Sequence, residues 1–201
     1  MKIGILGGSF DPIHNGHINM AVKAYEEYNL DEIWIMPAGH SPNKDECKMT
    51  DAYTRFEMCK LAVEKYDFIN VSDHEINKTT TSYTYLTLQE LQFLHPNDKF
   101  YFIMGADSLD YLEDWAHPEI IASLCTILVV VRENFDNQAM NSKISELKKL
   151  FPCDIQFVHC NRYDISSTQI RENLYKKTDI KQFIPKEVLE FILERRLYNQ
   201  E

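Results

Sequence analysis

Two histidines lie beside a glycine-rich segment near the start of the chain, Gly7-Gly8-Ser9-Phe10-Asp11-Pro12-Ile13-His14-Asn15-Gly16-His17. If a helix begins near Gly16, imidazoles three residues apart point toward the same end of a crevice and can donate hydrogen bonds to phosphate oxygens. Gly7 and Gly8 let backbone amides approach a ligand closely, and the positive end of the helix favours an anion. The glycines alone could serve only a tight turn, and one histidine alone could serve only to cap a helix or to pack. Two histidines beside a glycine-rich turn together favour a phosphate site.

Other familiar phosphate and metal motifs are absent from the sequence. It contains neither the dinucleotide-binding motif GxGxxG nor the phosphate-binding loop GxxxxGK(S/T). An ordinary dehydrogenase and a kinase with that loop are therefore not supported. A zinc site is a weaker interpretation of the two histidines, because no third ligand follows at a recognisable spacing. The five cysteines (47, 59, 125, 153 and 160) are odd in number and include no CxxC pair, which indicates reduced thiols.

A second cluster of phosphate-binding groups lies near the other end of the chain. Ser166, Ser167 and Thr168 are followed one helical turn later by Arg171. Hydroxyls at a helix N-terminus and a guanidinium suit a triphosphate, although Ser-Ser-Thr alone is most often only an N-cap.

Charge and composition limit the classes of protein to consider. The chain has 201 residues and a formal net charge of −10, which disfavours a protein that coats duplex nucleic acid. No apolar run approaches the roughly 20 residues of a membrane span, and the apolar segment at residues 1–8 is too short for a signal peptide. We expect a cytoplasmic protein with no membrane association and no nucleic-acid partner.

Short apolar runs alternate with helical patterns along the chain. Six runs are predicted to be strands covered on both faces: 2–6, 32–36, 68–71, 99–104, 126–131 and 154–158. Ile18, Ala21, Val22 and Tyr25 form one apolar stripe of a helix, and further helices are predicted near 51–66, 83–95, 138–150, 167–176 and 186–196. The order predicts an α/β fold: one doubly wound, Rossmann-like domain with a mostly parallel sheet and helices on both faces.

This fold determines where a ligand binds. We expect residues 1–201 to form a single domain, with the C-terminal helices (about 167–196) packed on it. Open parallel sheets bind ligands beyond the carboxyl ends of their strands, and the unusual residues follow predicted strand ends. Both phosphate-binding segments are therefore predicted to meet at one crevice.

The chain also resembles a known family. GGSFDPIHNGH resembles the GxFxPxHxGH signature of the nucleotidyltransferases with an HxGH motif, and residues 165–171, ISSTQIR, are similar to their second signature, ISSTxIR. Residues 71–76, 81–84 and 102–108, with Trp115, resemble the bacterial nicotinate-mononucleotide adenylyltransferases. The resemblance runs from Lys2 to about Arg171. Where the family commonly has Pro-His-Lys, this chain has Pro42-Asn43-Lys44, which keeps the cation but alters one phosphate donor.

The resemblance implies transfer of AMP from ATP to nicotinate mononucleotide, giving deamido-NAD and pyrophosphate in NAD biosynthesis. It implies that His14 and His17 are catalytic and stabilise the α-phosphate, while Mg²⁺ arrives with ATP. The implied ATP-binding residues are Gly7, Gly8, Ser9, Phe10, Ser166, Ser167, Thr168 and Arg171. No protein residue is expected as a metal ligand.

The implied mononucleotide-binding residues are Lys44, Thr84, Gly105, Asp107 and Trp115. Trp115 can stack on a cationic pyridinium, although a packing role explains it equally well. Backbone N–H groups near Thr84 and Trp115 would select a carboxylate over an amide, because a carboxylate only accepts hydrogen bonds. Asp107 could accept from ribose hydroxyls, or be only a loop residue.

Several alternatives remain open from the sequence. Enzymes that act on phosphopantetheine or nicotinamide mononucleotide are the nearest rivals, and a catalytically silent nucleotide-binding regulator is an alternative of another class. Arg55 is interpreted as a surface salt-bridge residue, and Asp73 and Glu75 as structural acceptors. The oligomeric state cannot be predicted.

Overall fold

The computed structural model describes residues 1–40, 49–131, 138–160, 165–176 and 178–198. Six parallel strands form one sheet in the order β3-β2-β1-β4-β5-β6. The strands are β1 (Lys2–Gly8), β2 (Glu32–Pro37), β3 (Ile69–Val71), β4 (Lys99–Gly105), β5 (Cys125–Val131) and β6 (Ile155–His159). All six predicted strands are confirmed to within two residues at their ends.

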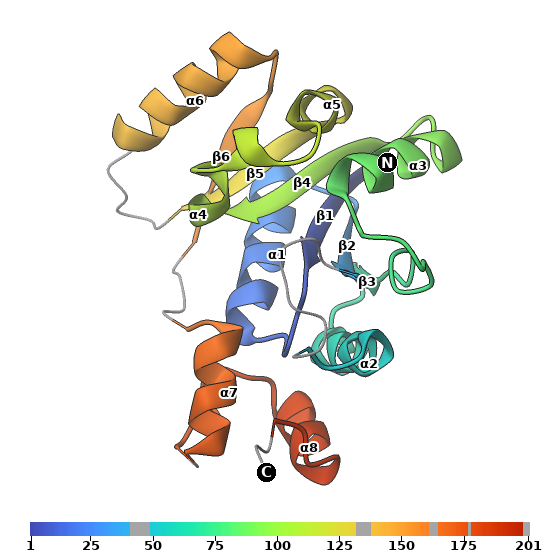
Figure 1. Ribbon diagram of the computed structural model, residues 1–201, viewed down its shortest axis with the longest axis vertical. Helices are drawn as coiled ribbons and strands as arrows, with labels where there is room; N and C mark the ends of the chain where they lie inside the picture. Colours follow the sequence, from blue (N-terminus) through green and yellow to red (C-terminus); the bar gives the residue numbers. More distant parts are fainter. Residues whose placement is uncertain (41–48, 132–137, 161–164, 177, 199–201) are drawn as a thin grey trace.

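Helices cover both faces of the sheet (Figure 1). One face packs against α1 (Asn15–Tyr28), α2 (Ala52–Val63), α7 (Ser167–Tyr175) and α8 (Lys186–Glu194). The other packs against α3 (Thr84–Leu94), α5 (Pro118–Leu124) and α6 (Gln138–Leu150). The predicted doubly wound, Rossmann-like architecture is therefore confirmed.

Alternation along the strands divides the core into these two layers. In β5, Ile127 and Val129 belong to the layer under α3, α5 and α6, whereas Leu128 and Val130 belong to the layer under α1 and α8. Because both faces are buried, the strands are apolar almost without interruption, which is why the sequence shows them so clearly.

The connection from β4 to β5 contains helices that the sequence patterns do not predict. These are α4 (Ala106–Leu109), a 3₁₀ turn η2 (Leu112–Asp114) and α5. Each is too short to show a full apolar stripe, since α5 has only 7 residues. The apolar stripe of α1 also differs slightly from the prediction: Ile18, Ala21 and Ala24 are its buried residues.

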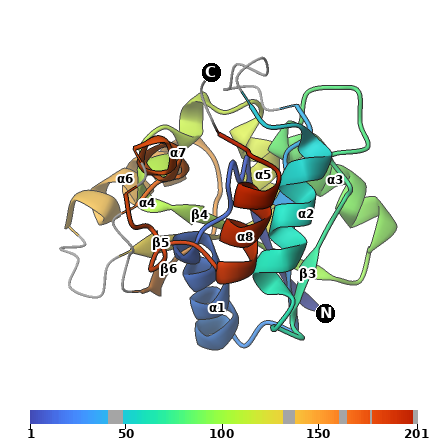
Figure 2. The same cartoon turned by 90° about the horizontal axis from the view of Figure 1, so that it is seen from below.

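The C-terminal helix α8 lies alongside α2 (Figure 2). Val188 and Ile192 are buried in the same core layer as α1 and α2. Among the described residues, no helix is both long and apolar enough to cross a membrane.

Candidate active site

The segment between β1 and α1 forms one wall of the candidate active site. Phe10 is buried and has a positive φ of 47°. This left-handed backbone turns the chain sharply after Ser9, since a bulky residue adopts it only where surrounding contacts hold it. As a result Asp11, Ile13 and His14 are buried at the end of the sheet.

His14 and His17 lie together at the start of α1. Their rings stack with centroids 3.6 Å apart and planes 28° apart. The backbone N–H of His14 donates to Nδ1 of His17 over 3.2 Å. A neutral His17 that accepts through Nδ1 carries its proton on Nε2, which leaves Nε2–H as a donor for a ligand.

Both imidazoles are held in the neutral form. Burial lowers the pKa of His14 to about 4. Burial, and secondarily the neighbouring His14, hold the pKa of His17 well below 6.5. Near neutral pH the pair therefore donates hydrogen bonds without carrying positive charge in the free protein.

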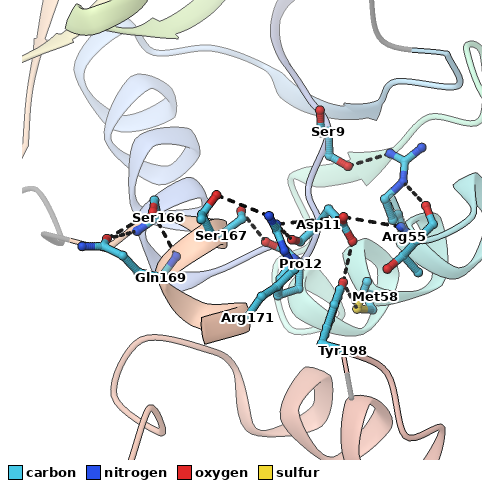
Figure 3. A network of polar contacts seen from close by, with 12 residues as sticks. Ser9, Asp11, Pro12, Arg55, Met58, Ser166, Ser167, Gln169, Arg171 and Tyr198 are labelled. Carbon is cyan, nitrogen blue, oxygen red and sulfur yellow. Dashed lines mark hydrogen bonds and ion pairs between the residues drawn. The ribbon is translucent and has the colours of Figure 1, made fainter. Parts of the chain in front are cut away.

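Helix α7 forms the opposite wall. Ser166 is its N-cap, and the Oγ of Ser166 accepts from the backbone N–H of Gln169 over 3.2 Å. The Ser167 hydroxyl donates to the carbonyl of Pro12 over 2.9 Å, and Arg171 donates to the carbonyl of Asp11 over 2.6 Å. Figure 3 shows these contacts, which join α7 to the segment after β1 although about 155 residues separate them.

The two walls enclose a first cavity of about 580 Å³. Its lining includes Ser9, Phe10, Asp11, His14, His17, Gly105, Ser166, Ser167, Thr168 and Arg171. Imidazoles, hydroxyls, a guanidinium and a helix N-terminus converge here, and all of these groups suit phosphate oxygens. The structure thus brings together the two segments that the sequence predicts to meet.

A second cavity of about 640 Å³ lies on the other side of β1. Its lining includes Gly7, Gly8, Ser9, Glu75, Ser82, Thr84, Thr87, Phe102 and Trp115. Ser9 lines both cavities, so a molecule in one can meet a molecule in the other beside this residue.

Apolar and polar groups are both present in the second cavity. Trp115 packs edge-on against Phe102, with ring centroids 6.1 Å apart. Its indole Nε1 is buried and has no hydrogen-bond partner among the described residues. Helix α3 begins at Thr84, so its positive end lies at this cavity.

Glu75 is the buried carboxyl of the second cavity. It accepts from the Thr87 hydroxyl over 2.7 Å, and burial raises its pKa. The expectation that Glu75 and Asp73 are structural acceptors is confirmed, since Asp73 accepts from Asn77 over 3.0 Å. Neither Thr87 nor Phe102 is predicted at the site from the sequence: Thr87 belongs to no motif, and Phe102 lies in a segment that resembles the family but has no predicted role of its own.

The interpretation of Arg55 as a surface salt-bridge residue is wrong. Arg55 is 1% exposed, and its guanidinium donates to the carbonyls of Thr50, Ser9 and Ala38 over 2.9, 2.6 and 2.6 Å. It therefore holds together the segments that follow β1 and β2 (Figure 3). Burial is what lowers its pKa, and partner carbonyls satisfy the charge.

The remaining predicted residues fall at several places. Gly7 and Gly8, predicted at ATP, line the second cavity, and Gly105, predicted at the mononucleotide, lines the first. Asp107 lies on α4, directly after β4. Asn43 and Lys44 lie outside the described residues. Within the described part of the chain, no group of three His, Cys, Asp or Glu side chains could hold a metal ion.

A parallel sheet with a histidine pair after β1 and a capped, arginine-bearing helix after β6 defines a nucleotidyltransferase. The chain belongs to the cytidylyltransferase-like family, whose model matches residues 5–173. The names of its relatives identify the kind of nucleotidyltransferase: they are nicotinate-nucleotide adenylyltransferases. It is 40% identical over 195 residues to a "Probable nicotinate-nucleotide adenylyltransferase" of Clostridium botulinum strain Okra, which covers 96% of this chain and 97% of that protein. Identity to the protein of that name from strain Eklund 17B is 38%, over 100% of this chain and 99% of that protein.

Solved structures agree with this assignment. Plasmodium falciparum nicotinic acid mononucleotide adenylyltransferase complexed with NaAD has a TM-score of 0.81 and 26% identity, covering 98% of this chain and 97% of that chain. The same Plasmodium enzyme complexed with APC has a TM-score of 0.79 and 26% identity, covering 98% and 96%.

Proposed function

We propose that the first cavity binds ATP, that the second binds nicotinate mononucleotide, and that adenylyl transfer between them occurs beside Ser9. The observation that carries this proposal is that two adjoining cavities share Ser9, with the histidine pair in the wall of the first. The products would be deamido-NAD and pyrophosphate, as expected of a nicotinate-nucleotide adenylyltransferase.

The chemistry needs no protein base. The second pKa of a phosphate monoester is near 6, so the 5′-phosphate of the mononucleotide is already a dianionic nucleophile at neutral pH. It attacks the α-phosphorus of ATP in line, a new P–O bond forms, and the bond to the pyrophosphate breaks. Catalysis then rests on alignment and on stabilising the charge that develops at the α-phosphate.

The residues of the first cavity divide this work. Nε2–H of His17 and the ring of His14 would donate to the α-phosphate oxygens. The N-terminus of α7, with Ser167, Thr168 and Arg171, is suited to the β- and γ-phosphates.

Mg²⁺ is proposed to arrive with the nucleotide. The groups of the first cavity are mainly donors, which fit phosphate oxygens better than a cation. The ion would therefore be held by the phosphates and water, and it would supply further charge neutralisation when bound.

Substrate choice provides the test. Nicotinate mononucleotide should be about 5- to 150-fold better in kcat/KM than nicotinamide mononucleotide, because the amide presents donors to the N–H groups at the start of α3, beside Thr84, at a cost of about 1–3 kcal/mol. Trp115→Ala should raise KM for both mononucleotides and leave ATP binding nearly unchanged. Pyrophosphate release measures each rate, and Trp34→Ala controls for loss of a half-buried indole elsewhere.

Equal efficiencies in the parent enzyme would contradict acid specificity, and no release with either substrate would favour a silent nucleotide-binding regulator.

A further inference from the structure

The end of the described chain returns to the segment after β1. Beyond α8, Arg196 and Tyr198 both have positive φ, at 53° and 61°. Bulky residues rarely adopt this conformation, which costs free energy unless other contacts hold it. The contact that it permits is a hydrogen bond of 2.7 Å from the Tyr198 hydroxyl to Oδ1 of Asp11 (Figure 3).

Asp11 stands between Tyr198 and Arg171. The Asp11 side chain is 6% exposed, and its carboxylate also accepts from the backbone N–H of Thr50 over 3.4 Å. Its carbonyl oxygen accepts from Nη1 of Arg171 over 2.6 Å, while its Oδ2 lies 4.0 Å from the same nitrogen. Arg171 is therefore oriented by the backbone of Asp11, at the outer limit of an ion pair with the carboxylate.

A buried carboxylate needs donors, and those available here decide where it points. Tyr198 supplies the shorter of the two side-chain hydrogen bonds described above. Without it, the carboxylate would turn toward the nearest cation, Arg171, and close the ion pair. The ion pair would then neutralise the guanidinium, whose side chain is 33% exposed, and leave less positive charge for a ligand of the first cavity, which Asp11 and Arg171 both line.

The phenol is suited to this task. Burial, and secondarily the charge of Asp11, raise the pKa of Tyr198, so the hydroxyl remains a donor at any physiological pH. The hydroxyl also lies 4.0 Å from the sulfur of Met58 on α2.

We propose that Tyr198 is a positioning residue for nucleotide binding: it holds the Asp11 carboxylate so that Arg171 does not close an ion pair with it, and the charge of the guanidinium stays available to the polyphosphate. The proposal rests on the proposed function only in taking a nucleoside triphosphate as the ligand of Arg171. It gives the C-terminal segment a part in substrate binding as well as in packing.

Tyr198→Phe tests the proposal, because it removes one hydroxyl and keeps the ring. KM for ATP, and the Kd for ATP measured by calorimetry, should rise about 10-fold, as expected for loss of a hydrogen bond to a charged group. KM for nicotinate mononucleotide should change less than about 2-fold. Tyr28→Phe is the matched control: its hydroxyl donates over 2.8 Å to the carbonyl of Phe157, away from both cavities, and its loss should not move ATP affinity.

A double variant separates positioning from general packing. If Tyr198 acts through the charge of Asp11, then adding Tyr198→Phe to Asp11→Asn should change ATP affinity by less than about 2-fold, since an amide has no charge with which to capture Arg171. An unchanged ATP Kd in Tyr198→Phe would overturn the proposal, as would an equal effect of Tyr198→Phe in both backgrounds.

The test also works if Tyr198→Phe alone does not fold. In that case the ATP affinity of the double variant is compared with that of Asp11→Asn. If it too were unfolded, Tyr198 would be a packing residue and the proposal would be wrong. Failure of the proposed function would look different: the parent would bind ATP by calorimetry yet release no pyrophosphate with any mononucleotide.

Discussion

His14 and His17 combine two properties that phosphate chemistry needs: they are fixed by stacking, and they are neutral donors. A neutral donor can strengthen its hydrogen bond as negative charge develops on the α-phosphate, without first attracting a competing anion into the site. Rigid, neutral imidazoles therefore favour the transition state over the ground state.

His17→Ala should lower kcat by about 10²–10³ with little change in KM for the mononucleotide, because it removes a donor used mainly in the transition state. Steady-state pyrophosphate release under saturating substrates measures the effect. His95→Ala, in the turn after α3, is the control and should leave kcat nearly unchanged. A folded His17→Ala enzyme with turnover close to the parent would contradict the assigned role.

The low pKa of His14 also predicts how stability depends on pH. The folded-state pKa is about 4 against 6.5 for the unfolded chain, so between these values the unfolded state binds a proton that the folded state does not. Stability is fully present above about pH 6.5 and should fall by up to about 3 kcal/mol as pH drops toward 4. Denaturant unfolding at pH 7, 5.5 and 4.5 measures this, and His14→Gln should show a clearly shallower fall. The same slope in both proteins would exclude His14 as the source.

Helix α7 places its N-terminus at the phosphate site, and the capping box of Ser166 and Gln169 determines where that helix begins. The helix has only 9 residues, so it depends on its cap and on packing of Ile170 more than on intrinsic propensity. The cap thus serves both helix stability and the position of the first backbone N–H groups.

Ser166→Ala should cost about 1 kcal/mol of stability and raise KM for ATP more than KM for the mononucleotide. Thermal unfolding and substrate titrations provide the two readouts. Ser145→Ala is the matched control, since that hydroxyl donates to the carbonyl of Asn141 on the exposed side of α6. Equal effects of the two substitutions on ATP KM would show that the α7 cap has no special relation to the site.

The site lies where the order of the strands in the sheet reverses, between β1 and β4. The connections from these strands run to opposite faces, which opens the crevice that both cavities occupy. On one face, α8 completes the core layer shared with α1 and α2, and it also delivers the chain to Tyr198.

Two adjacent residues of α8 test how much the molecule depends on this closure. Ile192 is 1% exposed and Leu193 is 62% exposed. Ile192→Ala should lower the free energy of unfolding by about 2–4 kcal/mol, while Leu193→Ala should stay within about 0.5 kcal/mol of the parent. Chemical denaturation of both variants checks this. Similar small losses would mean that α8 is only loosely attached.

The sequence by itself determined most of the fold. Strands buried on both faces are apolar throughout, so all six could be located, and the alternation with helices required a parallel, doubly wound sheet. It also identified both walls of the first cavity, because the histidine pair and the Ser-Ser-Thr segment carry local signals of glycine, imidazole and capping hydroxyls.

Only the tertiary structure decided the contacts between distant segments. Arg55 looks like any helical surface arginine, yet it is buried because three carbonyls from separate strand ends and a loop converge on it. Tyr198 carries no motif, and its role depends on an Asp11 that is 187 positions away in the chain. Such contacts depend on how α2 and α8 pack on the sheet, and local periodicity and propensity contain no information about that packing.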